Sequence, residues 1–89
     1  MVIEVKANPE VSFPDLQEDL QKLSQFAARH HFKLGILLIV NNDPSRIKML
    51  LQSHINQLRD LELPEKIRVL VREGVDSDLR EASLAELIA

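Results

Sequence analysis

The segment Leu34 to Val40 constrains this chain more than any other feature, because it is an unbroken aliphatic run without a polar side chain. Such a run is typical of a β-strand that is buried on both faces, as in the middle of a parallel sheet. Replacing Leu38 with Asp is therefore expected to unfold the domain, since a buried unpaired carboxylate costs several kcal/mol. The run is far shorter than the roughly 20 apolar residues that cross a bilayer, so we expect no membrane partner.

The segments on either side of this run alternate between strand and helix patterns. Strands show alternation with a period of two, and helices show apolar residues at steps of three and four. The expected elements are strands at 2–7, 34–40 and 67–72 and helices at 13–31, 44–61 and 78–88. This βαβαβα order predicts a single α/β domain over residues 1–89, with a three-stranded, mainly parallel sheet and the Leu34–Val40 strand in the centre.

A central second strand has a consequence for the surface of the sheet. Both crossover helices then lie on the same face, and only the short last helix is left to cover the aliphatic side chains of the other face. A partner subunit, or sequence that this chain does not contain, must cover that face. We therefore expect a homo-oligomer, in the first place a dimer with two-fold symmetry.

Composition removes several classes of function. The chain has no Cys, which excludes thiol catalysis, Cys-ligated zinc and disulfides. Its only aromatic residues are three Phe, so it lacks the stacking platforms of single-strand nucleic-acid binders. No basic segment followed by an apolar one stands at the N-terminus, and the cytoplasm is the expected compartment.

Charge is distributed unevenly along the chain. The net charge is -3, yet the segment from Leu20 to Lys48 holds five basic residues against one acid, Asp43. Within it, Lys33, Arg46 and Lys48 are the candidate nucleic-acid-binding residues, because a local basic face attracts phosphates. Solvated charges on helix surfaces are the simpler interpretation of the same pattern.

Glu4 and Lys6 are the candidate catalytic pair. They are two residues apart in a strand, so both side chains leave the same face. A carboxylate beside an ammonium at the carboxyl end of a parallel strand can bind a divalent metal and polarise a water or a phosphate. The simpler interpretation is a solvent-facing ion pair between the two side chains, worth at most about 1 kcal/mol.

Three segments together carry a resemblance to a known family. They are the strand Val2 to Ala7 with its Glu-x-Lys ending, the helical stretch Asp-Leu-Gln-Lys-Leu at residues 19–23, and the aliphatic segment Phe32 to Val40 with its early Gly. In this order they resemble the PD-(D/E)XK nuclease superfamily, over roughly residues 2–42. The resemblance implies that Glu4 is a metal ligand, that Lys6 orients the nucleophilic water and that Lys22 is a supporting basic residue. It also implies Mg²⁺ as the cofactor and nucleic acid as a partner.

The sequence departs from the family pattern at one position. The family places a metal-binding Asp on a hairpin upstream of the Glu-x-Lys strand, and only Met1, Val2 and Ile3 precede Glu4 here. The chain is then a piece of a longer nuclease-like protein, a remnant without catalysis, or a coincidental match. We expect a nuclease-like α/β domain without detectable turnover by itself. Two other functions stay open: a small interaction module that homodimerises through the uncovered sheet face, and a phosphate or small-molecule binder that uses the loops after the strands.

Overall fold

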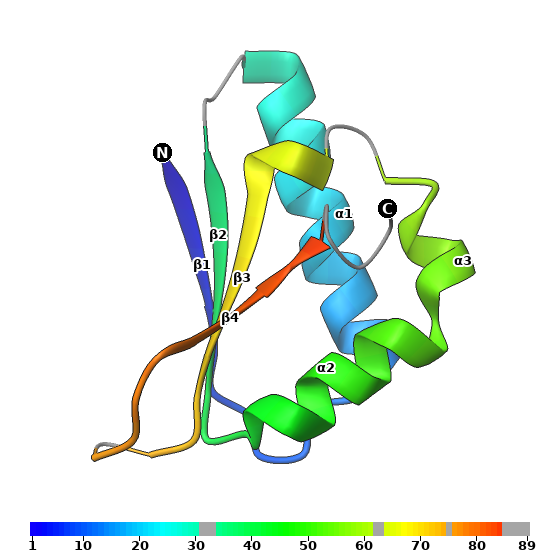
Figure 1. Ribbon diagram of the computed structural model, residues 1–89. Coiled ribbons are helices and arrows are strands. Elements are labelled where there is room, and N and C mark those ends of the chain that lie inside the picture. The colour runs from blue at the N-terminus through cyan, green and yellow to red at the C-terminus, as the bar shows by residue number, and fades with distance from the viewer. Residues whose placement is uncertain (31–33, 62–63, 75, 85–89) are drawn as a thin grey trace.

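The computed structural model describes residues 1–30, 34–61, 64–74 and 76–84, which form one sheet with helices beside it (Figure 1). In chain order the elements are β1 (Val2–Lys6), α1 (Phe13–His30), β2 (Gly35–Val40), α2 (Pro44–Ser53), α3 (Ile55–Leu58), the 3-10 helix η1 (Pro64–Lys66), β3 (Ile67–Arg72) and β4 (Arg80–Ser83). The predicted α/β class is confirmed. Within these described ranges, no helix has the length and apolar content needed to cross a bilayer.

The sheet has four strands in the order β1-β2-β3-β4. The first three run parallel, with β2 between β1 and β3, and β4 runs antiparallel to β3. The expectation of three strands followed by a last helix is wrong for Arg80–Ser83, which pair with β3 instead. A bidentate ion pair also joins β3 and β4: Arg68 Nε and Nη2 donate to the two carboxylate oxygens of Glu81 at 2.6 and 2.8 Å. Residues 85–89 of the predicted helix lie outside the described residues.

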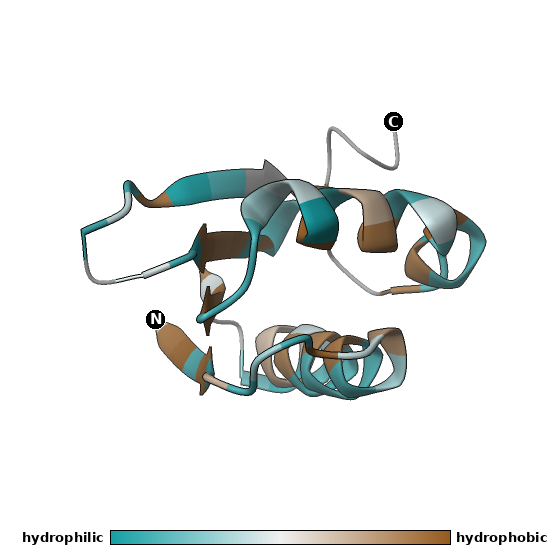
Figure 2. Ribbon diagram, turned by 90° about the horizontal axis from the view of Figure 1, so that it is seen from below, coloured by the Kyte–Doolittle hydropathy of each residue, from teal (hydrophilic) through white to brown (hydrophobic). Residues whose placement is uncertain are grey.

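The helices α1 and α2 lie on the same side of the sheet (Figures 1 and 2). Two successive right-handed crossovers between strands in sequential order place both helices there. The buried core fills the space between them: Leu16 and Leu20 of α1 meet Leu37 and Ile39 of β2, and none of the four is exposed. Val69 of the neighbouring strand is equally buried. This side of the sheet is called the helix face below.

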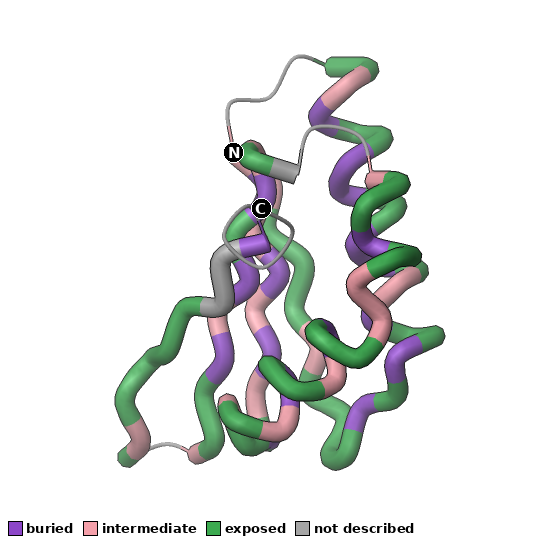
Figure 3. The backbone as a smooth tube through the Cα atoms, turned by 45° about the vertical axis from the view of Figure 1, so that its right-hand side comes forward, coloured by how far each residue is buried: buried purple, intermediate pink, exposed green. Residues whose placement is uncertain are grey.

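The other side of the sheet, called the open face, carries six aliphatic and three charged side chains. They are Ile3, Val5, Ile36, Leu38, Val40, Leu70, Arg68, Arg72 and Glu81, assigned by the strand register and the alternation of burial. Along β2, fully buried residues alternate with partly buried ones although the strand is interior (Figure 3). Ile3 and Val5 are 51% and 60% exposed. No described helix covers the open face (Figure 2), because β4 occupies Arg80–Ser83, where the sequence predicts a short last helix to cover part of it.

The loops at the carboxyl end of the parallel strands are tied together by Asn42, which is 3% exposed. Its Oδ1 accepts from the backbone N–H of Val11 at 3.0 Å, and its Nδ2 donates to the carbonyls of Asn8 and Val40 at 2.8 and 2.9 Å. The Asn42 side chain thus supplies hydrogen-bond partners to backbone groups of two loops that do not pair with each other. These bonds hold the loop from β1 to α1 against the loop from β2 to α2.

The second predicted helix begins as expected and ends earlier. The Asp43 carboxylate accepts from the backbone N–H of Ser45 at 3.0 Å, and Pro44 occupies the first turn. The helix predicted over 44–61 is interrupted at His54, whose backbone leaves the helical region at φ -119° and ψ 32°. The His54 ring stacks on Phe13 with 3.9 Å between ring centroids, and its Nδ1 lies 3.0 Å from the Leu50 carbonyl oxygen. Packing against the start of α1 therefore holds this break in place.

Candidate functional site

Strand β1 turns its polar side toward α1. By register with β2, the side chains of Val2, Glu4 and Lys6 lie on the helix face, and those of Ile3 and Val5 lie on the open face. The sequence predicts that Glu4 and Lys6 share a face, and the structure places them so. A strand normally directs its apolar side toward its helices, so β1 presents the reverse of the usual arrangement.

The Lys6 ammonium contacts α1 and not Glu4. Lys6 Nζ lies 3.0 Å from Asp19 Oδ2, and the two side chains are only 22% and 12% exposed. The hydrogen bond that the Lys6 ammonium donates to Asp19, together with the negative charges of Asp19, Asp15 and Glu18, raises the pKa of Lys6 above its ordinary value, against the opposing effect of burial. Lys6 is therefore a fixed cation at neutral pH and not a general base. The solvent-facing Glu4–Lys6 pair of the simpler interpretation is replaced by this pair between strand and helix.

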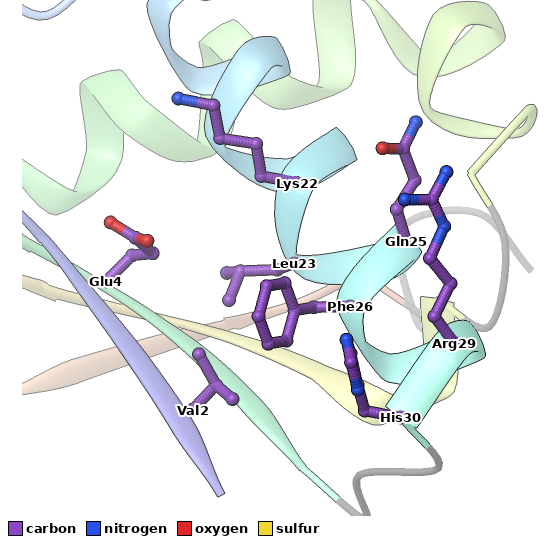
Figure 4. A pocket seen from close by; sticks show the side chains of 8 residues that line it. All are labelled: Val2, Glu4, Lys22, Leu23, Gln25, Phe26, Arg29 and His30. Atoms are coloured by element: carbon purple, nitrogen blue, oxygen red, sulfur yellow. The ribbon is translucent and has the colours of Figure 1, made fainter.

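Glu4 faces a pocket of about 260 Å³ between β1 and the second half of α1 (Figure 4). Leu23 and Phe26 point from α1 toward the strand and form its apolar side, and Glu4 stands opposite them. Lys22 lines the same pocket, so the structure brings two of the predicted site residues, Glu4 and Lys22, to one pocket. Its ammonium lies 3.3 Å from Glu18 Oε1, an exposed pair one helical turn apart that holds the side chain only weakly.

The described residues do not make up a metal site for Mg²⁺. Among them no three His, Asp or Glu side chains gather closely enough to hold an ion. Glu4 offers one carboxylate, and the Asp19 carboxylate is engaged by Lys6. Mg²⁺ takes six oxygens in near-octahedral order and is usually bound through one or two carboxylates plus substrate phosphates. The arrangement can orient an anion or a water through the Lys6 ammonium, but it provides only part of a cation site.

Of the three predicted nucleic-acid-binding residues, the structure describes Arg46 and Lys48. The Arg46 guanidinium is used within the fold: Nη2 donates to the Val11 carbonyl at 3.0 Å and Nη1 lies 3.4 Å from Asn42 Oδ1. Lys48 is exposed on α2 and lines a separate pocket of about 360 Å³ with Arg80. Lys33 lies outside the described residues. Arg46 and Lys48, the two that are described, line different pockets.

Asp19 and Asn42 have roles here that the sequence did not predict. Asp19 falls on the same helical stripe as Leu16, Leu20 and Leu23, and a carboxylate on an apolar stripe must find a partner when the helix packs. That signal is readable in the sequence, but it does not name Lys6 as the partner. Asn42 carries no such signal, because its bonds to Val11, Asn8 and Val40 depend on where two loops meet.

Comparison of the chain with models of protein families, with curated proteins and with solved structures gives no significant match.

Proposed function

We propose that this chain is a nuclease-like α/β domain whose phosphodiester-cleaving site is incomplete by itself. The observation that supports the proposal is the contact between Lys6 and Asp19 at 3.0 Å. It joins two of the three segments that carry the resemblance, the Glu-x-Lys strand and the Asp-Leu-x-Lys-Leu helix. Glu4 and Lys22, one from each of these two segments, line the same pocket.

The chemistry of these side chains suits a phosphodiester substrate. The Lys6 ammonium has three N–H donors, of which Asp19 takes one, so it can also donate to a phosphate oxygen or to an attacking water. Asp19 fixes the position of that ammonium, since it holds it from a helix that is packed on the core. Glu4 supplies a carboxylate on the same face of β1.

The same geometry accounts for the expected absence of turnover. Glu4 offers a single carboxylate, and Mg²⁺ is usually held through one or two carboxylates together with substrate phosphates. In the part of the chain that the structure describes, the remaining acidic groups do not assemble with Glu4 into a cluster of three. Another chain or segment would have to add at least one more oxygen ligand beside Glu4.

A plasmid-nicking assay tests the proposal. Supercoiled DNA is incubated with the wild-type chain, with Glu4→Gln and with the matched control Glu65→Gln, whose carboxylate is exposed on η1. With Mg²⁺ or Mn²⁺ we expect no cleavage above buffer in any of the three. Metal-dependent nicking by the wild type and by Glu65→Gln that disappears in Glu4→Gln would contradict the incomplete site and show an active nuclease.

A further inference from the structure

We propose that the outer edge of β1 binds an extended peptide, which adds a strand to the sheet and places one bulky apolar side chain in the pocket beside Glu4. This goes beyond the phosphodiester chemistry above, because it assigns the edge of the sheet to a polypeptide ligand. It rests on the direction of the backbone groups of β1, on the lining of the pocket and on the charge of Glu4.

The outer edge of β1 carries backbone groups that the described part of the chain does not pair. The Val2 N–H donates to the Leu34 carbonyl of the neighbouring strand segment at 3.1 Å. Backbone groups alternate in direction along a strand, so those of Ile3 and Val5 point away from β2. No described element lies beyond β1 on that side (Figure 2). An edge of this kind is a template for a further strand.

A pocket lies on the helix face directly beside this edge. Its volume is about 260 Å³, and Leu23 and Phe26 of α1 point into it toward β1 (Figure 4). A protein cavity of roughly 150 Å³ holds benzene, so this pocket has room for one large side chain. Phe26 is 48% exposed, which leaves apolar surface for a ligand to bury. The residue of an added strand that stands opposite Val2 directs its side chain to this face and is therefore a large apolar one.

Glu4 sets the charge of the ligand. Its carboxylate has no ion pair or hydrogen bond within the described residues, whereas Lys22 in the same lining lies 3.3 Å from Glu18 Oε1. A basic residue opposite Glu4 forms a cross-strand pair of opposite charge. In an antiparallel strand, the pairing that is slightly more stable per residue, this basic residue precedes the apolar one by two positions. The ligand is thus a peptide with the pattern basic, any residue, large apolar.

A second copy of this chain fits the edge less well. Antiparallel pairing of two β1 strands over more than three residues places Glu4, Lys6 or a residue of the following turn opposite Val2. No apolar side chain then enters the pocket. The pairing would also bring a second α1 to the same side of the sheet, beside the first (Figure 2). A short peptide without a helix avoids both problems.

NMR titration of the ¹⁵N-labelled chain with the capped peptide acetyl-STVKVLTS-amide tests the proposal. Saturable shifts are expected at the amides of β1 and of the pocket lining, with a dissociation constant below about 1 mM. Ile3→Pro removes the outward N–H and should weaken binding at least about tenfold, while proline is tolerated at such a position of an edge strand. The matched control Ile3→Thr keeps the N–H and should bind within about threefold of the wild type. Circular dichroism checks that both variants are folded. A titration without saturation, or an equal loss in both variants, would overturn the proposal.

A charge swap tests the register. The peptide acetyl-STVEVLTS-amide should bind the wild type at least about threefold more weakly than the peptide with lysine, and Glu4→Lys should reverse this preference. The control Glu65→Lys changes an exposed carboxylate on η1, outside the pocket lining, and should leave the preference unchanged. Binding that ignores the swap would refute the pairing of the ligand with Glu4. Dimerisation of the wild type that Ile3→Pro abolishes would assign the edge to a second copy and contradict the proposal.

Discussion

Leu37→Asp is expected to unfold the domain, whereas Leu38→Asp at the next position is expected to leave it folded. Leu37 lies on the helix face with no exposed surface, among the side chains of α1. An unpaired carboxylate there costs several kcal/mol, which is comparable to the whole stability of a domain of this size. Leu38 lies on the open face, where water reaches its side chain.

Circular dichroism and urea denaturation of the two variants measure this difference. Leu37→Asp should lack a cooperative transition, and Leu38→Asp should keep one, with a loss of about 1–2 kcal/mol. Equal unfolding of both variants would mean that the open face is covered within a single copy. The sequence alone predicts the opposite target, Leu38, because an unbroken aliphatic strand does not tell which of its faces the helices cover.

Asn42→Ala is expected to lower the free energy of unfolding by about 2–4 kcal/mol, because it leaves buried backbone groups without partners. The N–H of Val11 loses its acceptor, and the carbonyls of Asn8 and Val40 lose a donor. The destabilisation should be accompanied by faster hydrogen exchange at Val11, since its amide is bonded only through this side chain among the contacts described.

Asn41→Gly provides the matched control for the neighbouring position. Asn41 is exposed and adopts φ 63°, a conformation that Gly accepts without strain, and its only described bond is 3.3 Å to the Ala7 carbonyl. Its free energy of unfolding should stay within about 1 kcal/mol of the wild type. Similar losses in both variants would show that Asn42 does not hold the loops in the way described.

Local sequence patterns predict those elements of the fold whose structure depends on residues close together in the chain. The aliphatic run becomes the interior strand β2, and Asp43 followed by Pro44 begins α2 as its capping chemistry requires. The segment Arg80–Ser83 fails for a different reason. Its four residues are held as a strand by pairing with β3 and by the bond from Arg68, and neither is local in the sequence.

In the candidate site, too, the sequence predicts what depends on local pattern and misses what depends on contacts distant in the chain. The period of a strand is enough to place Glu4 and Lys6 on one face. The docking of α1 on the sheet decides which face of β1 meets the helix. It also decides that the Lys6 ammonium pairs with Asp19. Sequence periodicity contains no information on that docking, and it suggests the wrong side for an edge strand whose aliphatic residues point away from its helices.

The proposal that Glu4 belongs to an incomplete cation site is tested most directly by adding a second carboxylate to the same pocket. Lys22→Glu places a second carboxylate in the lining of the Glu4 pocket, and Gln21→Glu adds one on the neighbouring residue outside that lining. Mn²⁺ is titrated into both variants and the wild type, and paramagnetic broadening of the backbone amide signals is followed by NMR. The structure predicts saturable broadening centred on Glu4 in Lys22→Glu, at least about tenfold tighter than in the wild type or Gln21→Glu. Saturable binding at Glu4 in the wild type, or no gain in Lys22→Glu, would contradict the view that Glu4 is one ligand of an incomplete site.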